Sequence, residues 1–162
     1  MTFKGRGQEE AMKIAAIVNR KGSEFETVRE TTTLAEAIAT MHRLSIGSVG
    51  IVGRDPDDIH GIISQRELMA GIAERGIHAL QLPALIFMRR PVLFCRCDDS
   101  ADEVMRQMTR QRFRHGVVRR SDQTIAGLVS LGDLVAALLD EAMLEAGVLR
   151  DMARGRLLSV TN

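Results

Sequence analysis

The stretch that decides the fold is Gly127-Leu128-Val129-Ser130-Leu131-Gly132-Asp133, and it has an earlier counterpart in Gly61-Ile62-Ile63-Ser64-Gln65-Arg66-Glu67. In each, a glycine and two aliphatic residues predict a short buried strand that leads into a serine, with an acid three residues later. That spacing is a capping box, so each serine is expected to open a helix. Free backbone N–H groups and the positive dipole end at such a helix start can also bind an anion. The two stretches are therefore either helix caps alone or two corners that bind phosphate or ribose.

Capping boxes recur along the chain at a nearly constant spacing. They begin at four residues: Thr33, Ser64, Ser100 and Ser130. The interval between the first two boxes is almost the same as that between the last two, so the second pair repeats the spacing of the first. This regularity predicts an internal repeat, in which a unit of strand, helix, strand, strand and helix occurs twice. The expected fold class is α/β (α+β).

The repeat places the expected elements along the chain. For the first half the hydrophobic pattern predicts an N-terminal helix over 12–21, strands over 25–29, 49–52 and 59–63, and helices over 34–46 and 65–74. For the second half it predicts a short helix over 83–88, strands over 92–97, 116–118 and 125–129, and helices from 101 and over 131–145. Residues 148–162 are expected to add a helical turn before an irregular tail.

Composition narrows the class of protein. With 162 residues, a net charge of +1 and a pI of 7.9, bulk charge gives no reason to expect a nucleic-acid or membrane partner. Five phenylalanines, no tyrosine and no tryptophan offer few platforms on which single-stranded nucleic acid could stack. No run of about twenty apolar residues predicts a membrane span, and residues 1–6 lack the apolar centre of a signal peptide. We expect a cytoplasmic globular protein.

Candidate catalytic and metal-binding groups are sparse. Cys95 and Cys97 lie two residues apart in an expected strand, so both face the same side, but two thiols without a nearby histidine make a poor metal site. We expect reduced thiols and no metal. The sequence has no evident nucleophile–base pair and no Walker-type glycine-rich loop with lysine, so we predict that it is not an enzyme.

The two halves resemble a tandem pair of CBS domains, the module named after cystathionine beta-synthase, in its stand-alone bacterial form. Four stretches carry the resemblance: Ser45–Val49, Gly61–Glu67, Arg112–His115 and Gly127–Asp133. It covers roughly residues 12 to 145. It implies a first domain over 12–80 that includes the N-terminal helix, a second domain over 81–147, and a C-terminal tail over 148–162.

The resemblance implies an architecture and a ligand. In the CBS family two units pack about a pseudo-twofold axis with their sheets facing, and two such pairs usually form a homodimer. The clefts between units bind adenosine-containing ligands, here AMP, ADP, ATP or NAD, and no cofactor is required. The acid of the capping box accepts hydrogen bonds from the ribose, the serine or threonine lies beside the phosphate, and aliphatic side chains sandwich the adenine.

Carried over to this sequence, the resemblance assigns two groups of nucleotide-binding residues. In the second site, Asp133 would hold the ribose, Ser130 would bond near the phosphate, and Gly132 would leave room for close approach. The phosphate would also meet Arg114 and His115, and the adenine would lie against Phe94, Cys95, Gly116 and Val117. The first site would be formed by Ser64, Arg66, Glu67, Thr27, Gly47 and Ser48, with Glu67 standing where the family usually has aspartate.

Two functions remain open on the sequence. The first is a regulatory protein, a homodimer that senses an adenine nucleotide and passes the signal to an unidentified protein partner by a population shift between arrangements. The alternative is a dimerisation or scaffold module whose clefts are empty and which acts through protein partners. Neither function requires nucleic acid or a membrane.

Overall fold

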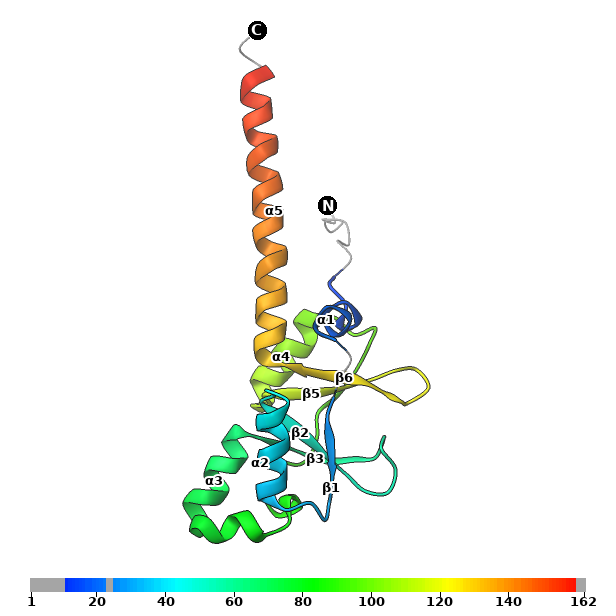
Figure 1. The fold of residues 1–162 in the computed structure, drawn as a ribbon. Coiled ribbons are helices and arrows are strands. Elements are labelled where there is room, and N and C mark those ends of the chain that lie inside the picture. The colour runs from blue at the N-terminus through cyan, green and yellow to red at the C-terminus, as the bar shows by residue number, and fades with distance from the viewer. Residues whose placement is uncertain (1–10, 23–24, 160–162) are drawn as a thin grey trace.

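The computed structural model of the protein describes residues 11–22 and 25–159 (Figure 1). Two units follow an N-terminal helix, α1 (Ile14–Lys21). The first unit consists of β1 (Thr27–Arg29), α2 (Leu34–Arg43), β2 (Ser48–Val52), β3 (Ile59–Ser64) and α3 (Gln65–Arg75). The second consists of β4 (Phe94–Arg96), α4 (Ala101–Gln111), β5 (His115–Arg119), β6 (Ile125–Ser130) and α5 (Leu131–Ser159).

Each unit contains a three-stranded sheet with the same topology. The middle strand pairs in parallel with the strand before it and antiparallel with the strand after it, in the orders β1-β2-β3 and β4-β5-β6. Both antiparallel ladders also shift register at equivalent places of the repeat, between Ile51 and Val52 and between Val118 and Arg119. The repeat and the α/β class predicted from the sequence are confirmed.

Three of the four predicted capping boxes are present. Thr33 and Ser64 each exchange hydrogen bonds with the acid three residues on, and Asp133 does the same with Ser130. The box predicted at Ser100 is wrong, because the Ser100 side chain makes no capping hydrogen bond. At the same helix start, the first backbone N–H of α4, that of Ala101, donates to the Met12 carbonyl at 2.9 Å, so a distant segment satisfies this donor.

The N-terminal helix joins the second unit rather than the first. Ile14, Ile17 and Val18 lie in the core of the second unit, and the Ile14 N–H donates to the Asp99 carbonyl at 3.0 Å. The predicted first domain included this helix, but its apolar face packs against elements far along the chain, among them β6 and α5. The core of the first unit is separate and lies between its own sheet and helices α2 and α3.

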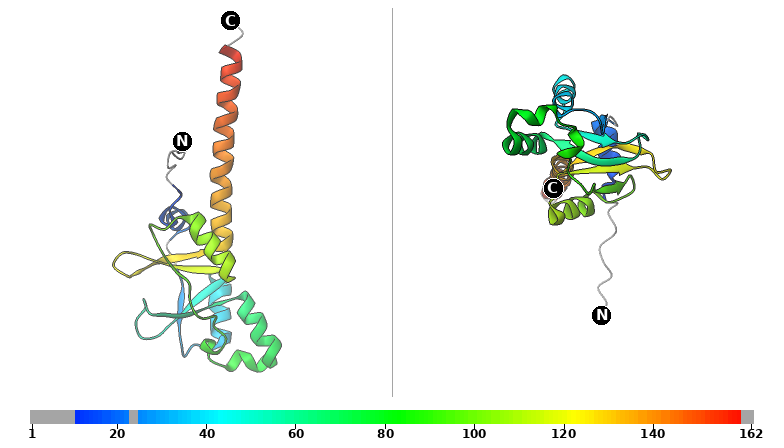
Figure 2. Two further views of the ribbon diagram at one scale, coloured as in Figure 1. Left: turned by 180° about the vertical axis from the view of Figure 1, so that it is seen from behind. Right: turned by 90° about the horizontal axis from the view of Figure 1, so that it is seen from below.

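A third apolar cluster joins the two units. Val52, Ile59 and Ile62 of the first sheet are buried together with Val117 of the second. The two sheets therefore face one another, with the helices on their outer sides (Figure 2). The turn between β2 and β3 adds a polar tie, because an Asp57 carboxylate oxygen accepts a hydrogen bond from the backbone N–H at the start of β6 at 2.9 Å.

The largest differences from the predicted element boundaries occur at three places. The strand expected over 92–97 is limited to β4, and the helix expected over 83–88 is a short 3-10 turn over Ala84–Ile86, preceded by another over Gly76–Gln81. The helix expected to end near 145 continues to Ser159 as one long helix, so the described part of the expected tail is helical; residues 160–162 lie outside the described residues. Among the described residues, no helix is both long and apolar enough to cross a membrane.

Candidate functional site

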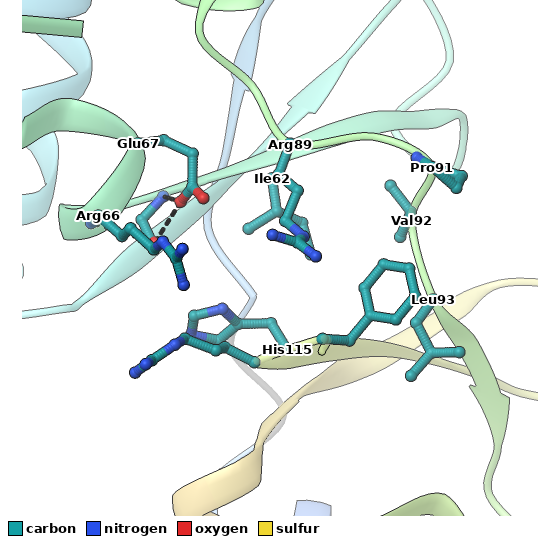
Figure 3. A pocket seen from close by; sticks show the side chains of 11 residues that line it. Ile62, Arg66, Glu67, Arg89, Pro91, Val92, Leu93 and His115 are labelled. Carbon is teal, nitrogen blue, oxygen red and sulfur yellow. Dashed lines mark hydrogen bonds between the residues drawn. The ribbon is translucent and has the colours of Figure 1, made fainter. Parts of the chain in front are cut away.

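A cleft lies between the two units, where the start of α3 faces the start of β5 (Figure 3). Its cavity volume is only about 20 Å³. Ligand pockets usually measure hundreds of cubic ångströms, so a nucleotide would have to displace at least one side chain. Eleven residues line the cleft: Ile62, Ser64, Arg66, Glu67, Arg89, Pro91, Val92, Leu93, Phe113, Arg114 and His115.

The Glu67 carboxylate both caps α3 and borders this cleft. Its Oε2 accepts a hydrogen bond from the Ser64 backbone N–H at 3.1 Å and another from the Ser64 hydroxyl. Its Oε1 forms no hydrogen bond to another described residue. Because a carboxylate offers about four acceptor positions, Glu67 can cap the helix and still accept from a ligand. The two interpretations of this motif are therefore compatible.

Three guanidinium groups give the cleft a positive lining. Arg66 lies in the first turn of α3, Arg89 in the connector between the units, and Arg114 directly before β5. Arg89 is already engaged: its Nη2 donates to the Arg112 carbonyl at 2.9 Å, and its guanidinium lies 5.2 Å from the centre of the Phe113 ring. Figure 3 shows this side chain reaching into the middle of the cleft, so it is the group that a ligand would move first.

The two ends of the cleft differ in character. Arg66 and Glu67 lie at one end and Pro91, Val92 and Leu93 at the other (Figure 3). The first end offers hydrogen-bond donors and an acceptor, and the second offers apolar surface. This arrangement suits an elongated ligand that carries an apolar ring at one end and hydroxyl or anionic groups at the other.

The repeat makes the two sides of the molecule chemically unequal. The first backbone N–H of α5 donates to the Arg114 carbonyl at 2.9 Å, and the first of α3 donates to the Gly47 carbonyl at 3.3 Å. Arg114 and His115 are thus the counterparts of Gly47 and Ser48. A basic pair therefore stands at one position of the repeat, and an uncharged pair of small residues at the other.

The grouping of predicted site residues changes accordingly. The sequence places Arg114 and His115 beside Asp133, and the structure keeps them at that corner, where His115 pairs with Ser130 in the sheet. It also puts both residues in the cleft with Ser64 and Glu67, which the sequence assigned to the other site. The reason is that the sheets pack face to face, so the start of β5 in one unit meets the end of β3 in the other. Gly47 and Ser48 remain next to Ser64, because Ser48 pairs with Ser64 in the sheet and the Gln65 N–H donates to the Gly47 carbonyl, but neither residue lines this cleft.

The corner at Asp133 is occupied by a lysine from α1. Lys21 Nζ lies 2.6 Å from Asp133 Oδ2 and 3.4 Å from the Leu128 carbonyl, and the same Oδ2 accepts from the Ser130 N–H at 2.7 Å. Burial alone would raise the pKa of Asp133, but the hydrogen bonds from Lys21 and Ser130 outweigh it and hold that pKa below the usual 3.8. The carboxylate stays charged, and the Lys21 ammonium already occupies one of its oxygens.

Comparison with known proteins identifies the repeated unit. The family model described as CBS domain matches twice, over residues 15–74 and 84–140. The chain belongs to the CBS-domain family. It is 32% identical to a CBS-domain containing protein from Agrobacterium tumefaciens whose crystal structure matches with a TM-score of 0.70, over 77% of this chain and 97% of that one.

Two further relatives are similar at lower identity. A CBS domain protein from Pyrobaculum aerophilum, complexed with AMP, is 22% identical and matches with a TM-score of 0.69 over 82% of this chain and 99% of that one. An uncharacterised 17.7 kDa protein of Acidianus ambivalens is 26% identical over 145 residues, which are 90% of this chain and 84% of that protein. Among the described residues of this CBS pair, no cluster of three or more histidine, cysteine or acidic side chains could hold a metal ion.

The residues predicted to contact adenine lie outside the cleft. Cys95 is buried in the core of the second CBS unit, where burial raises the pKa of its thiol to about 12, so it remains a protonated core residue. Phe94 is 37% exposed, and the Arg119 guanidinium lies 3.8 Å from its ring centre. Gly116 and Val117 are buried in β5, with Val117 in the cluster between the sheets.

The last two predicted site residues, Thr27 and Gly132, also lie outside the cleft, in the sheet of the first unit and at the Asp133 corner. Thr27 lies half-buried in β1, next to Gly50 of the neighbouring strand. Gly132 follows Ser130 at the start of α5, and an added side-chain carbon there would meet only the Ser130 hydroxyl oxygen within 4 Å. The backbone at this corner is therefore accessible, as the sequence predicts, while its carboxylate is held by Lys21.

Sequence reasoning missed the connector between the CBS units. Arg89 and the apolar run Pro91–Leu93 line the cleft, and the backbones of Arg89 and Ile62 exchange two hydrogen bonds, at 2.8 and 3.2 Å, that fix the connector beside β3. The available signal was the basic pair Arg89-Arg90 directly before an apolar strand. Its proximity to Glu67 depends on tertiary packing, which no local pattern encodes.

Two histidines of this CBS pair are expected to titrate on opposite sides of the usual value. Burial lowers the pKa of His115, and Lys21 and Arg114 act in the same direction, while Glu67 and Asp133 oppose them. The hydrogen bond to Asp58 raises the pKa of His60 against the opposing effect of burial, and Glu30 adds to the increase. In an NMR titration we expect the midpoint of His60 above pH 6.5 and that of His115 below it.

The variants His60→Gln and His115→Gln each remove one imidazole and so show which NMR signal belongs to which histidine. Because a folded-state pKa that is raised stabilises the fold only at low pH, the stabilisation from His60 should be complete below pH 6.5 and be lost as the pH rises through its folded pKa. The opposite order of the two midpoints would contradict the burial of His115 in the cleft.

Proposed function

We propose that this CBS pair is a regulatory protein that binds an adenine nucleotide in the cleft between its two units and works as a homodimer. CBS-pair proteins are generally regulatory nucleotide-binding modules, and the Pyrobaculum aerophilum relative is complexed with AMP. The observation that carries the proposal is the convergence of Glu67, three arginines and an apolar wall on one cleft.

Each part of the nucleotide has a chemically suitable partner. The ribose hydroxyls would donate to the unoccupied Oε1 of Glu67, which lies at the polar end of the cleft. The phosphates would meet Arg66 and Arg114, whose planar guanidinium groups form two parallel hydrogen bonds to phosphate oxygens. The adenine would lie against Ile62 and Val92 once Arg89 leaves the middle of the cleft.

Charge suggests which nucleotide is preferred. The lining holds three arginines and one carboxylate, so a ligand with several negative charges compensates the cleft better than one with none. We expect affinity to rise from adenosine through AMP to ADP and ATP, and to fall with added salt. Regulation would follow if the bound nucleotide stabilises one arrangement of the two units over another.

Titration calorimetry tests the proposal directly. The purified protein is titrated with adenosine, AMP, ADP, ATP and NAD, and a denatured sample is examined by mass spectrometry for a co-purified nucleotide. Lack of tyrosine and tryptophan makes bound adenine easy to see, since it would dominate the ultraviolet absorbance. An adenine nucleotide that binds in these experiments supports the proposal, and adenosine binding as tightly as ATP contradicts the assigned phosphate contacts.

The alternative function, a scaffold with empty clefts, has its own support. Lys21 already pairs with Asp133, and Arg89, which occupies the middle of the cleft, bonds to the Arg112 carbonyl. Charged groups that a ligand would use therefore already have partners within the chain. If nothing is released from the denatured protein and no nucleotide binds, the scaffold function is favoured and the search moves to protein partners.

A further inference from the structure

The last helix, α5, extends far beyond the body of the molecule. Its first turns pack on the second CBS unit through Leu134 and Ala137, and Asp140 forms an ion pair with Arg20 of α1 at 3.4 Å. Beyond that point the helix projects away from both units, as Figures 1 and 2 show. Between residues 142 and 154 every side chain except Gly147 is exposed. An isolated helical segment of this kind gains little stability in water without a partner.

One face of α5 carries an apolar stripe with coiled-coil spacing. Its members lie alternately four and three residues apart: Val135, Leu139, Ala142, Ala146, Leu149 and Ala153. Its three large residues, Val135, Leu139 and Leu149, are 48%, 57% and 66% exposed, the first two although they lie in the turns that pack on the body. Apolar positions that alternate by three and four residues form the seam of two packed helices, and alanines in such a seam allow the helices to approach closely.

Two charged residues beside the stripe identify the partner. Glu145 and Arg150 flank it on opposite sides and are five residues apart, which is the separation of residues that face each other across a parallel two-stranded coiled coil. Within one helix such a pair does not meet, because neighbours are three or four residues apart. Neither residue forms an ion pair within the described part of the chain.

We propose that the α5 stripe packs against the α5 stripe of a second copy of this chain, in parallel and in register, with Glu145 of each copy facing Arg150 of the other. The twofold axis then runs along the seam and relates the two ion pairs, so both form together, as a closed symmetric interface requires. The proposal goes beyond the homodimer of the proposed function, since it names the surface and the direction of pairing, and it does not depend on a ligand in the cleft.

Disulfide cross-linking tests which face of α5 forms the interface. Leu149→Cys places a thiol in the seam, and Leu144→Cys places one on the opposite face of the same helix at similar exposure, 71% against 66%. Under mild oxidation, Leu149→Cys should form a species of twice the 17.9 kDa chain mass at least about tenfold more than Leu144→Cys, because parallel helices in register bring identical seam residues together. The wild-type chain controls for Cys97, which is partly exposed. Equal cross-linking of the two variants, or none, would overturn the proposal.

Charge reversal tests the ion pairs. Glu145→Arg alone and Arg150→Glu alone should each weaken self-association in sedimentation experiments, since like charges would then face each other. A mixture of the two variants should form heterodimers, because the arginine introduced in one variant then faces the glutamate introduced in the other, while the second pair keeps Glu145 facing Arg150. The double variant should associate like the wild type. Homodimers of unchanged strength in both single variants would rule out the parallel register. Nucleotide titration of the same variants distinguishes failure of this interface from failure of the cleft as a ligand site.

Discussion

Glu67→Ala is expected to weaken nucleotide binding by about 10- to 100-fold while leaving the protein folded. The Glu67 carboxylate borders the cleft, and its Oε1 is available to the ribose hydroxyls. Hydrogen bonds to a charged group contribute about 1.5–3 kcal/mol, which corresponds to a loss of this size when the acceptor is removed. Calorimetric titration with ATP measures the effect.

The difficulty is that Glu67 also caps α3, so a loss of binding could follow from a loosened helix. The chain contains a matched control in Glu36, which makes the same capping box with Thr33 at the start of α2. Glu36 is not among the residues that line the cleft. Both substitutions should lower the free energy of unfolding by a similar, small amount, because each removes one partner of a capping box.

Comparison of the two variants separates the two roles of the motif. If Glu67→Ala and Glu36→Ala lower stability alike but only the first lowers affinity, Glu67 acts on the ligand. Equal affinities of both variants and the wild type would remove Glu67 from the binding site and reduce its role to capping.

The fold was predictable because the chain repeats its local signals. The four Ser/Thr-x-x-acid boxes recur at matching positions in the two halves and mark the helix starts after each strand, and three of them cap helices as predicted. The fourth, at Ser100, does not form, since the Ser100 side chain makes no capping hydrogen bond. Whether a capping side chain forms its hydrogen bond depends on the tertiary packing around the helix start, which a local sequence pattern does not contain.

The site was predictable only in part, for the same physical reason. Ser64, Arg66, Glu67, Arg114 and His115 were all candidates, and the structure brings these five together in one cleft. Their grouping depends on the packing of the two sheets, because each unit supplies one side of a cleft. A local pattern identifies which residues can bind a ligand but not which of them face each other.

Lys21→Met is expected to allow a second nucleotide to bind per chain. The Lys21 ammonium lies 2.6 Å from Asp133 Oδ2 and contacts the Leu128 carbonyl at 3.4 Å, so it competes with a ribose for this carboxylate and neutralises its charge. Without the lysine, Asp133 Oδ2 accepts only from within its own capping box and no cation among the described residues pairs with the carboxylate, which is the arrangement of Glu67 in the cleft. Calorimetry of the variant with ATP measures the number of sites.

Arg20→Met provides the control, because Arg20 lies near the end of the same helix and pairs with Asp140 at 3.4 Å through side chains that are both more than half exposed. Removal of either pair should change stability by no more than about 1 kcal/mol. A second site in Lys21→Met but not in Arg20→Met would show that Lys21 blocks the Asp133 corner.

Two other results would contradict this role of Lys21. An unchanged single site in Lys21→Met would mean that the corner lacks phosphate ligands even when it is open, as the uncharged pair Gly47 and Ser48 would explain. Weaker binding in Lys21→Met would mean that Lys21 serves the ligand as a cation. The asymmetry between Arg114-His115 and Gly47-Ser48 favours one strong site, with Lys21 as the charge partner that keeps Asp133 ionised in the absence of a second ligand.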